Sequence, residues 1–141
     1  MKKKLSAVLA AALALSMLSG CSNTNALPDD VDQDAMADAA QAIVDQLADG
    51  QYQAVADAFR DDLQQTYSIT AQTVEDLMST LEEAGAYVST KEFMISDGDN
   101  DDFDEPYAVV TIYCEHEEDD VLYEVSLDLD LQLIGLTAKE K

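Results

Sequence analysis

The spacing of the apolar residues changes once along this chain of 141 residues, at Gly85. Before Gly85 they recur every three or four residues, which is typical of amphipathic helices, and after it they recur mainly every second residue, which is typical of strands. Helices that precede all the strands favour an α+β fold over alternating βαβ units. We therefore expect N-terminal amphipathic helices packed on one face of an antiparallel four-stranded meander sheet.

Three helices are predicted before Gly85. The first begins at Asp34, with Asp32 or Asp34 as its cap, and ends at Gly50. The second is predicted from one apolar stripe: Tyr52, Val55, Ala56, Phe59 and Leu63. The third has Thr70 as its N-cap and ends at Gly85. Its apolar face consists of Val74, Leu77, Met78 and Leu81.

Four strands are predicted after Gly85, at residues 87–95, 107–115, 121–129 and 131–136. The second is apolar on both faces, as expected for a central strand. The third alternates between apolar and polar residues from Val121 to Leu129, so we expect one buried and one solvated face. A turn at residues 128–132 is predicted to lead into the short last strand.

The first twenty residues have the organisation of a secretory signal. Three lysines at residues 2–4 precede a fourteen-residue apolar run, which as a helix would span only about 21 Å, less than the hydrocarbon core of a membrane. The sequence LSGC at residues 18–21 then resembles the lipobox of bacterial lipoproteins. The resemblance implies cleavage before Cys21 and a diacylglyceryl group on its thiol. The alternative is an ordinary signal peptide that is cut elsewhere.

This N-terminal pattern predicts three regions in the chain: a signal peptide at 1–20, lipidated Cys21 with a flexible tether through residue 33, and a single domain at 34–141. The expected location is the cell membrane, with the domain anchored by lipid on the extracytoplasmic face. Two acyl chains hold a protein stably where a single chain holds it weakly. The membrane is therefore an expected partner through the anchor.

Charge excludes one class of partner. Removing residues 1–20 leaves four basic and thirty acidic side chains, a formal charge of about −26. Nucleic-acid binding depends on basic side chains that neutralise phosphates, so no nucleic acid is expected as a partner. With Cys21 lipidated, Cys114 is the one remaining cysteine, and no internal disulfide is expected.

The acidic segment at residues 97–105 places Asp97, Asp99 and Asp101 at alternate positions, as calcium loops do. Asp102 and Ala108 stand where an EF-hand needs glycine and glutamate. We therefore expect a solvated connector, with weak cation binding as the alternative. No metal centre and no cofactor are expected.

Cys114 and His116 lie two residues apart on a predicted strand and share a face, as the members of a zinc site or a nucleophile–base pair would. The chain has no second histidine, and no other cysteine is available to complete such a site. We therefore expect a buried Cys114 and a surface His116.

Three segments resemble a known family: ADGQYQAVADAF at 48–59, EEAGAYVS at 82–89 and LDLDLQLIGL at 127–136. The family is a domain of unknown function that is common in lipoproteins of Gram-positive bacteria. It looks like a short relative of the nuclear transport factor two-like (cystatin-like) fold, and the resemblance covers roughly residues 35–137. It usually carries glycine where this chain has Leu131. The family has no assigned chemistry, so the resemblance implies no catalytic residue.

In folds of this kind a cone-shaped pocket can open between the helices and the sheet, and apolar walls with a few hydroxyl groups suit small ligands. Four tyrosines are the candidate pocket residues: Tyr52, Tyr107, Tyr113 and Tyr123. The alternative is that they are amphipathic residues at the edge of the core.

These features favour a surface lipoprotein whose single domain is not an enzyme and binds an envelope protein or a small ligand. One alternative is a small pocket enzyme of hydrolase or isomerase type that uses a tyrosine and an aspartate. Another is a structural dimerisation module, and self-association as a homodimer is left open.

Overall fold

The computed structural model describes residues 27–29, 31–98 and 105–141, and the predictions for the signal peptide, Cys21 and most of the acidic segment lie outside them. The described helices are α2 (Gln33–Ala48), α3 (Tyr52–Ala58), α4 (Asp61–Tyr67), α5 (Ala71–Ser79) and the 3-10 helix η1 (Glu82–Ala84). The strands are β1 (Tyr87–Asp97), β2 (Tyr107–His116), β3 (Asp120–Asp128) and β4 (Leu133–Glu140). The helices precede the strands, which confirms the α+β fold.

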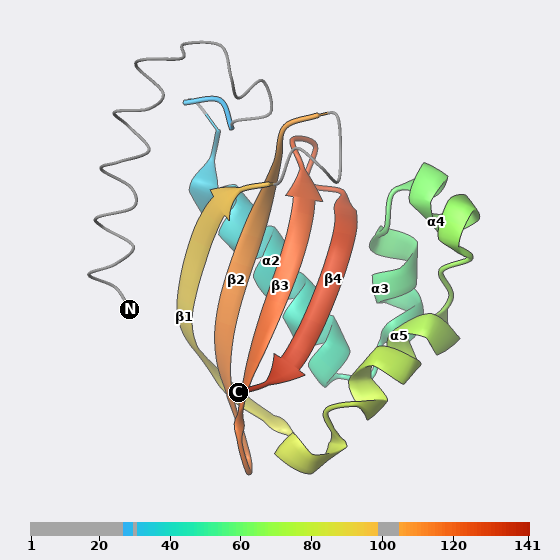
Figure 1. Cartoon of the computed structure of the whole chain (residues 1–141), viewed down its shortest axis with the longest axis vertical. Coiled ribbons are helices and arrows are strands. Elements are labelled where there is room, and N and C mark those ends of the chain that lie inside the picture. The colour runs from blue at the N-terminus through green and yellow to red at the C-terminus, as the bar shows by residue number, and fades with distance from the viewer. Residues whose placement is uncertain (1–26, 30, 99–104) are drawn as a thin grey trace.

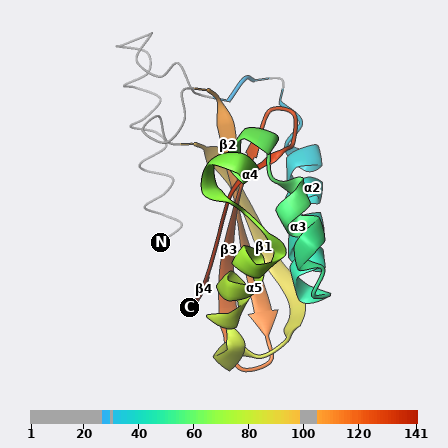
Figure 2. The same cartoon turned by 90° about the vertical axis from the view of Figure 1, so that its right-hand side faces the viewer.

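The four strands form one antiparallel meander in the order β1-β2-β3-β4, so β2 is a central strand as predicted. Figure 2 shows the sheet nearly edge on, with α2 and α3 along one face. In Figure 1, α2 crosses behind the strands, and α3, α4 and α5 lie beyond the β4 edge. None of the helices in the described part of the chain is long and apolar enough to cross a membrane.

The first predicted helix is confirmed as α2. Asp32 is its N-cap, and the Asp32 side chain accepts a hydrogen bond of 3.0 Å from the backbone N–H of Ala35. The helix ends just before Gly50, whose φ of +73° lies in the left-handed region that favours glycine. The side of α2 that faces the sheet is apolar and buries Met36, Ala40, Ile43, Val44 and Leu47.

The prediction of one second helix through Leu63 is wrong, because the chain breaks into α3 and α4. Phe59 and Arg60 adopt extended backbone angles between them. The reason is a tertiary contact: Phe59 forms an isolated bridge with Leu133, and the Arg60 N–H donates to the Leu133 carbonyl at 2.9 Å. The Arg60 N–H therefore bonds to β4 and not to a carbonyl of α3, and the helix is interrupted at this point.

The third helix begins as predicted and ends earlier. Thr70 is the N-cap of α5 and forms a reciprocal capping box with Thr73. The α-helix stops at Ser79 instead of continuing to Gly85, and a turn of 3-10 helix, η1, fills the interval. Gly85 then follows with φ +80° and ψ −167°, a conformation that is essentially restricted to glycine.

The last hairpin also departs from its predicted bounds. The turn at residues 128–132 is present, closed by hydrogen bonds from Leu131 N–H to Asp128 O and from Asp128 N–H to Gln132 O. However, β3 ends at Asp128, so Leu129 is exposed, and β4 starts at Leu133 and is longer than predicted. Leu131 has a φ of +66°, which explains why glycine suits this position.

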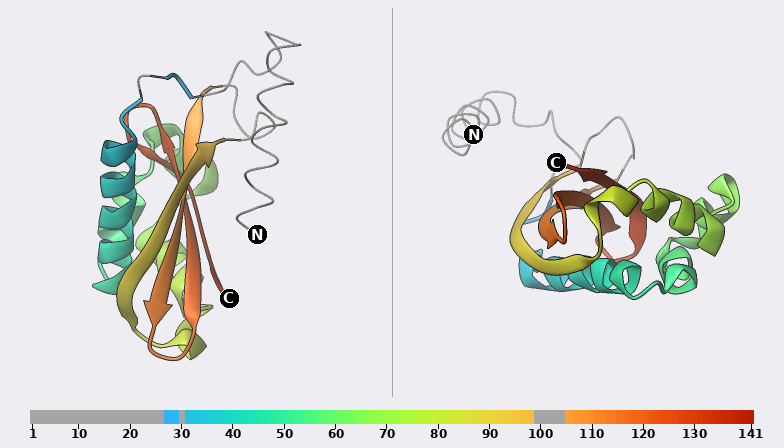
Figure 3. Two further views of the ribbon diagram at one scale, coloured as in Figure 1. Left: turned by 90° about the vertical axis from the view of Figure 1, so that its left-hand side faces the viewer. Right: turned by 90° about the horizontal axis from the view of Figure 1, so that it is seen from below.

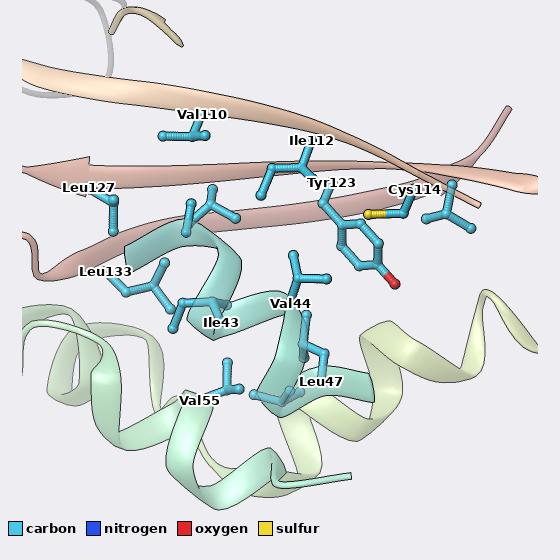
Figure 4. Close-up of a cluster of buried hydrophobic side chains, with 14 of the residues drawn as sticks. Ile43, Val44, Leu47, Val55, Val110, Ile112, Cys114, Tyr123, Leu127 and Leu133 are labelled. Carbon is cyan, nitrogen blue, oxygen red and sulfur yellow. The ribbon is translucent and has the colours of Figure 1, made fainter. Parts of the chain in front are cut away.

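The main core lies between α2 and the sheet. Figure 4 shows Val44 and Leu47 of α2 and Val55 of α3 facing Ile112, Tyr123, Leu127 and Leu133 of the strands. A smaller cluster forms on the opposite face of the sheet, where Leu63 of α4 packs with Tyr107 and Ile134. The helices therefore pack mainly on one face of the sheet, and Leu63 of α4 packs on part of the other.

Candidate functional site

A cavity of about 410 Å³ opens where the C-terminal end of α2 and the start of α3 meet the beginning of β1. We call this cavity the cleft. The residues that define its walls are Ala48, Tyr52, Met78, Tyr87, His116 and Tyr123. They come from three helices and three strands, so the cleft lies between the helices and the sheet.

His116 and Tyr123 form a buried polar pair in the wall of the cleft. The Tyr123 hydroxyl lies 3.0 Å from His116 Nε2, and His116 Nδ1 lies 2.8 Å from the carbonyl oxygen of Gly85. Because a carbonyl only accepts, Nδ1 carries a proton. In the neutral ring, Nε2 is then the acceptor for the Tyr123 hydroxyl. Both ring nitrogens are thus engaged, which fixes the orientation of the imidazole.

The backbone at Gly85 makes this arrangement possible. A Cβ at Gly85 would come within 2.9 Å of the Glu117 Cβ, so glycine allows the close approach of the two segments. Ala86 and Glu117 then exchange two hydrogen bonds: Ala86 N–H donates to Glu117 Oε1, and Glu117 N–H donates to Ala86 O, both at 2.9 Å. These two hydrogen bonds tie the residue before β1 to the residue after β2.

The prediction of a surface His116 is therefore wrong, since the residue is 5% exposed. The strand β2 extends to His116, and residues of even number on β2 face the helices. His116 consequently shares the buried face with Ile112 and Cys114, which confirms the predicted buried Cys114. The spacing of two places Cys114 and His116 on the same face of the strand, and the burial of His116 could have been predicted from that signal.

Tyr87 connects the cleft to a polar network on the sheet. Its ring meets the His116 ring edge to face, with centroids 5.9 Å apart. Its hydroxyl lies 2.8 Å from the Thr90 hydroxyl, and Thr90 in turn donates to Gln41 Oε1 at 2.7 Å. Tyr87 was not among the candidate pocket residues of the sequence. The network holds the Tyr87 ring against α2.

Burial raises the pKa of the Tyr123 hydroxyl far above its ordinary value and also raises the pKa of the Cys114 thiol. Tyr123 therefore stays protonated at physiological pH and acts as a hydrogen-bonding group. Cys114 stays a thiol, and the Thr90 hydroxyl lies 3.8 Å from its sulfur. The arrangement suits recognition of a ligand by hydrogen bonds better than attack by a thiolate.

The four candidate tyrosines do not come together. Tyr52 and Tyr123 line the cleft, whereas Tyr107 and Tyr113 lie on the opposite face of the sheet. Tyr107 packs in the small cluster with Leu63 and Ile134, and the ammonium of Lys141 lies 5.0 Å from the Tyr113 ring centroid. The prediction of a single pocket built from all four is wrong. The register is the reason, because β3 pairs Tyr123 with Ile112 and not with Tyr113.

No group of three or more histidine, cysteine, aspartate or glutamate side chains that could hold a metal ion occurs in residues 27–29, 31–98 and 105–141. Asp97, the first residue of the acidic segment, accepts a hydrogen bond of 3.3 Å from the Leu27 N–H. Asp99 and Asp101 lie outside the described residues.

The fold of this chain is similar to that of a solved structure described as "NMR structure of protein from Ruminococcus gnavus ATCC 29149". The two share 23% sequence identity with a TM-score of 0.65, over 80% of this chain and 96% of the other. At that identity the similarity shows the fold alone. No curated protein matches. A family model described as "Protein of unknown function (DUF3887)" matches residues 40–136, which is most of the chain, and the protein belongs to that family.

Proposed function

We propose that the mature protein is a lipid-anchored binding module on the extracytoplasmic face of the cell membrane, and that its cleft takes up a small ligand. The observation that carries this proposal is the cavity of about 410 Å³ in which the His116–Tyr123 pair faces Tyr52 and Tyr87. Aromatic walls with a few fixed hydrogen-bonding groups are typical of small-molecule sites.

The position of the cleft supports an anchored receptor. The tether enters the domain at Gln33, where α2 begins, while the cleft is lined by Ala48, where α2 ends. Sixteen helical residues separate these points by about 24 Å. In Figure 3, the start of α2 and the start of β1 lie at opposite ends of the sheet. A lipid on Cys21 would therefore leave the mouth of the cleft directed away from the membrane.

The side chains that line the cleft restrict the charge and the hydrogen-bonding groups of the ligand. The hydroxyl groups of Tyr52 and Tyr87 can donate or accept, the Tyr123 oxygen can accept while its proton bonds His116, and Glu82 adds a carboxylate to the lining. The strong negative charge of the chain disfavours anions. We expect an uncharged or cationic molecule with an apolar body and one or two hydrogen-bonding groups.

Catalysis is the alternative function, because acid–base enzymes also use buried pairs of histidine and tyrosine side chains. The raised pKa of Tyr123 makes its hydroxyl a poor base at neutral pH, since removal of its proton leaves a buried charge. The imidazole of His116 is held at both nitrogens. These contacts favour binding over turnover.

Blocking the mouth of the cleft tests the proposal. Full-length protein would be recovered from native membranes, and the small molecules that co-purify with it identified by mass spectrometry. Ala48→Phe places a ring at the mouth of the cleft on an exposed position of α2, and Ala42→Phe makes the same change at an exposed position outside the cleft lining. A ligand should co-purify with the wild type and with Ala42→Phe, and be lost from Ala48→Phe.

Equal recovery from both variants would contradict binding in the cleft. Conversion of the co-purified molecule into a product on incubation with the protein would favour the enzymatic alternative. The same preparation, cross-linked before recovery and compared with an equally acidic unrelated lipoprotein, reports on a protein partner. Enrichment of one envelope protein that survives Ala48→Phe would move the function from the cleft to another surface.

The anchor has its own test. Cys21→Ser removes the thiol that would carry the lipid, and fractionation of cells should then move the protein from the membrane to the soluble fraction or the medium. A Cys21→Ser protein that still partitions with membranes would refute the lipid anchor.

A further inference from the structure

A second cavity, of about 510 Å³, lies on the face of the sheet opposite α2. We call it the groove. Its lining residues come from all four strands and include Asp97, Tyr107, Thr111, Glu124, Ser126 and Gly135. The cleft shares none of these residues, so an inference about the groove does not depend on the proposed function.

The sheet register explains the hollow. Val109, Ser126 and Gly135 are direct neighbours in one row across the strands. Gly135 contributes no side chain, and a Cβ there would come within 3.2 Å of the Ser126 side chain. The row is therefore lower than its neighbours on either side. Toward the β3–β4 turn, the small cluster of Tyr107, Ile134 and Leu63 forms an apolar wall beside it.

The next row in the other direction is polar. Thr111, Glu124 and Thr137 are direct neighbours across β2, β3 and β4. The Thr137 hydroxyl donates to Glu124 Oε1 at 3.1 Å, which orients the carboxylate. The ion pairs between described residues in this structure, such as Arg60–Glu105 and Lys91–Asp120, do not use the Glu124 carboxylate. The groove thus joins an apolar wall to an oriented carboxylate among hydroxyl oxygens.

We propose that the groove binds an aliphatic primary amine. An ammonium group has three donors and no acceptor, and Glu124 with the hydroxyl oxygens of Thr111 and Ser126 provides acceptors on one side. The alkyl stem would lie along the row of Val109 and Gly135 toward the apolar wall. The net negative charge of the chain favours a cation over an anion as the ligand.

Two sources share this chemistry, an alkyl diamine and the side chain of a lysine. Titrations would use the full-length protein, labelled with nitrogen-15 and held in a neutral detergent, with three probes. The probe n-pentylamine imitates a lysine side chain, 1,5-diaminopentane is a diamine, and 1-pentanol has a similar stem without the charge. The readout is the amide signal of Ser126 and its neighbours. We expect saturable shifts with the amines and at least about tenfold weaker binding of 1-pentanol.

Equal affinity of the two amines would assign the site to a single ammonium such as that of lysine, and tighter binding of the diamine would assign it to diamines. Either result supports the proposal. Equal affinity of pentanol and the amines would overturn it, as would an absence of saturable shifts. Shifts of the same amides with protein concentration alone would also overturn it, because they would place a second copy of the chain in the groove.

Variants distinguish specific binding in the groove from nonspecific attraction of amines by the negative charge of the chain. Glu124→Gln keeps the size and the hydrogen bond with Thr137 and should weaken amine binding about fivefold. Glu115→Gln removes the same charge at an exposed position of β2 outside the lining of the groove and should change affinity less than twofold. Gly135→Val fills the hollow and should abolish binding. Equal losses in Glu124→Gln and Glu115→Gln would refute a specific site.

Discussion

Replacing Tyr123 by phenylalanine isolates the contact on which the cleft depends. Tyr123 is 1% exposed, and its hydroxyl bonds His116 Nε2 at 3.0 Å. The substitution removes this one oxygen atom and leaves the ring in the core. A matched control is Tyr67→Phe, which removes the same atom from a side chain that is 69% exposed.

The expected loss of unfolding free energy follows from the buried His116 ring, which the substitution leaves without its hydrogen-bond partner at Nε2. A hydrogen bond of this kind contributes about 1 kcal/mol, and an abandoned buried partner costs about 1–3 kcal/mol. His116 is 5% exposed at the wall of an open cleft, so water can replace part of the lost bond. We expect Tyr123→Phe to lower the free energy of unfolding by about 1–2 kcal/mol. For a domain of this size, the corresponding fall in Tm is about 5–10 °C.

Urea unfolding followed by circular dichroism measures this loss, with the m-value checked for constancy. Tyr67→Phe should change the free energy of unfolding by less than about 0.5 kcal/mol. In a His116→Leu background, Tyr123→Phe should cost much less than in the wild type, because its partner is already gone. A loss for Tyr123→Phe no larger than that of Tyr67→Phe, or an equal loss in both backgrounds, would refute a stabilising His116–Tyr123 bond.

Three further predictions follow from the backbone and the core. Gly85→Ala should lower the free energy of unfolding by about 1–3 kcal/mol in the same urea assay. The φ of +80° disfavours any side chain, and the new Cβ would collide with Glu117. An unchanged urea midpoint would contradict this prediction. Leu131→Gly should raise the free energy of unfolding by about 0.5–1 kcal/mol, because glycine adopts a φ of +66° without strain. A lower free energy of unfolding would contradict this, because it would mean that the contacts of the Leu131 side chain stabilise more than its backbone strain costs. The raised pKa of Cys114 favours the folded state while the thiol is protonated, so stability should fall as pH rises above about 8.5, where the unfolded thiol ionises. Unfolding measured from pH 7 to pH 10 should show a smaller fall in Cys114→Ala, and an identical fall would contradict this contribution.

Much of the secondary structure could be predicted from the sequence because it depends on neighbours along the chain. The change of period at Gly85 indicated helices followed by strands, and Thr70 caps α5 because its side chain reaches the backbone of its own first turn. The central position of β2 and the turn at residues 128–132 were likewise local signals. These elements are specified by hydrogen bonds and apolar spacing within a few residues.

The cleft could not be predicted in full from the sequence, because it is formed by contacts between residues that are far apart along the chain. Phe59 and Arg60 continue a helical stripe in the sequence, but pairing with Leu133, more than seventy residues later, holds them extended. Tyr113 and Tyr123 are both alternating strand residues, and a shift of one residue in register would have placed them on the same face. Local patterns along the chain therefore predict the order of helices and strands, and the composition accounts for the acidic character of the protein. The contacts of His116 with Tyr123 and Tyr87 could not be predicted in this way, because strand register and the backbone conformation at Gly85 set which side chains come together.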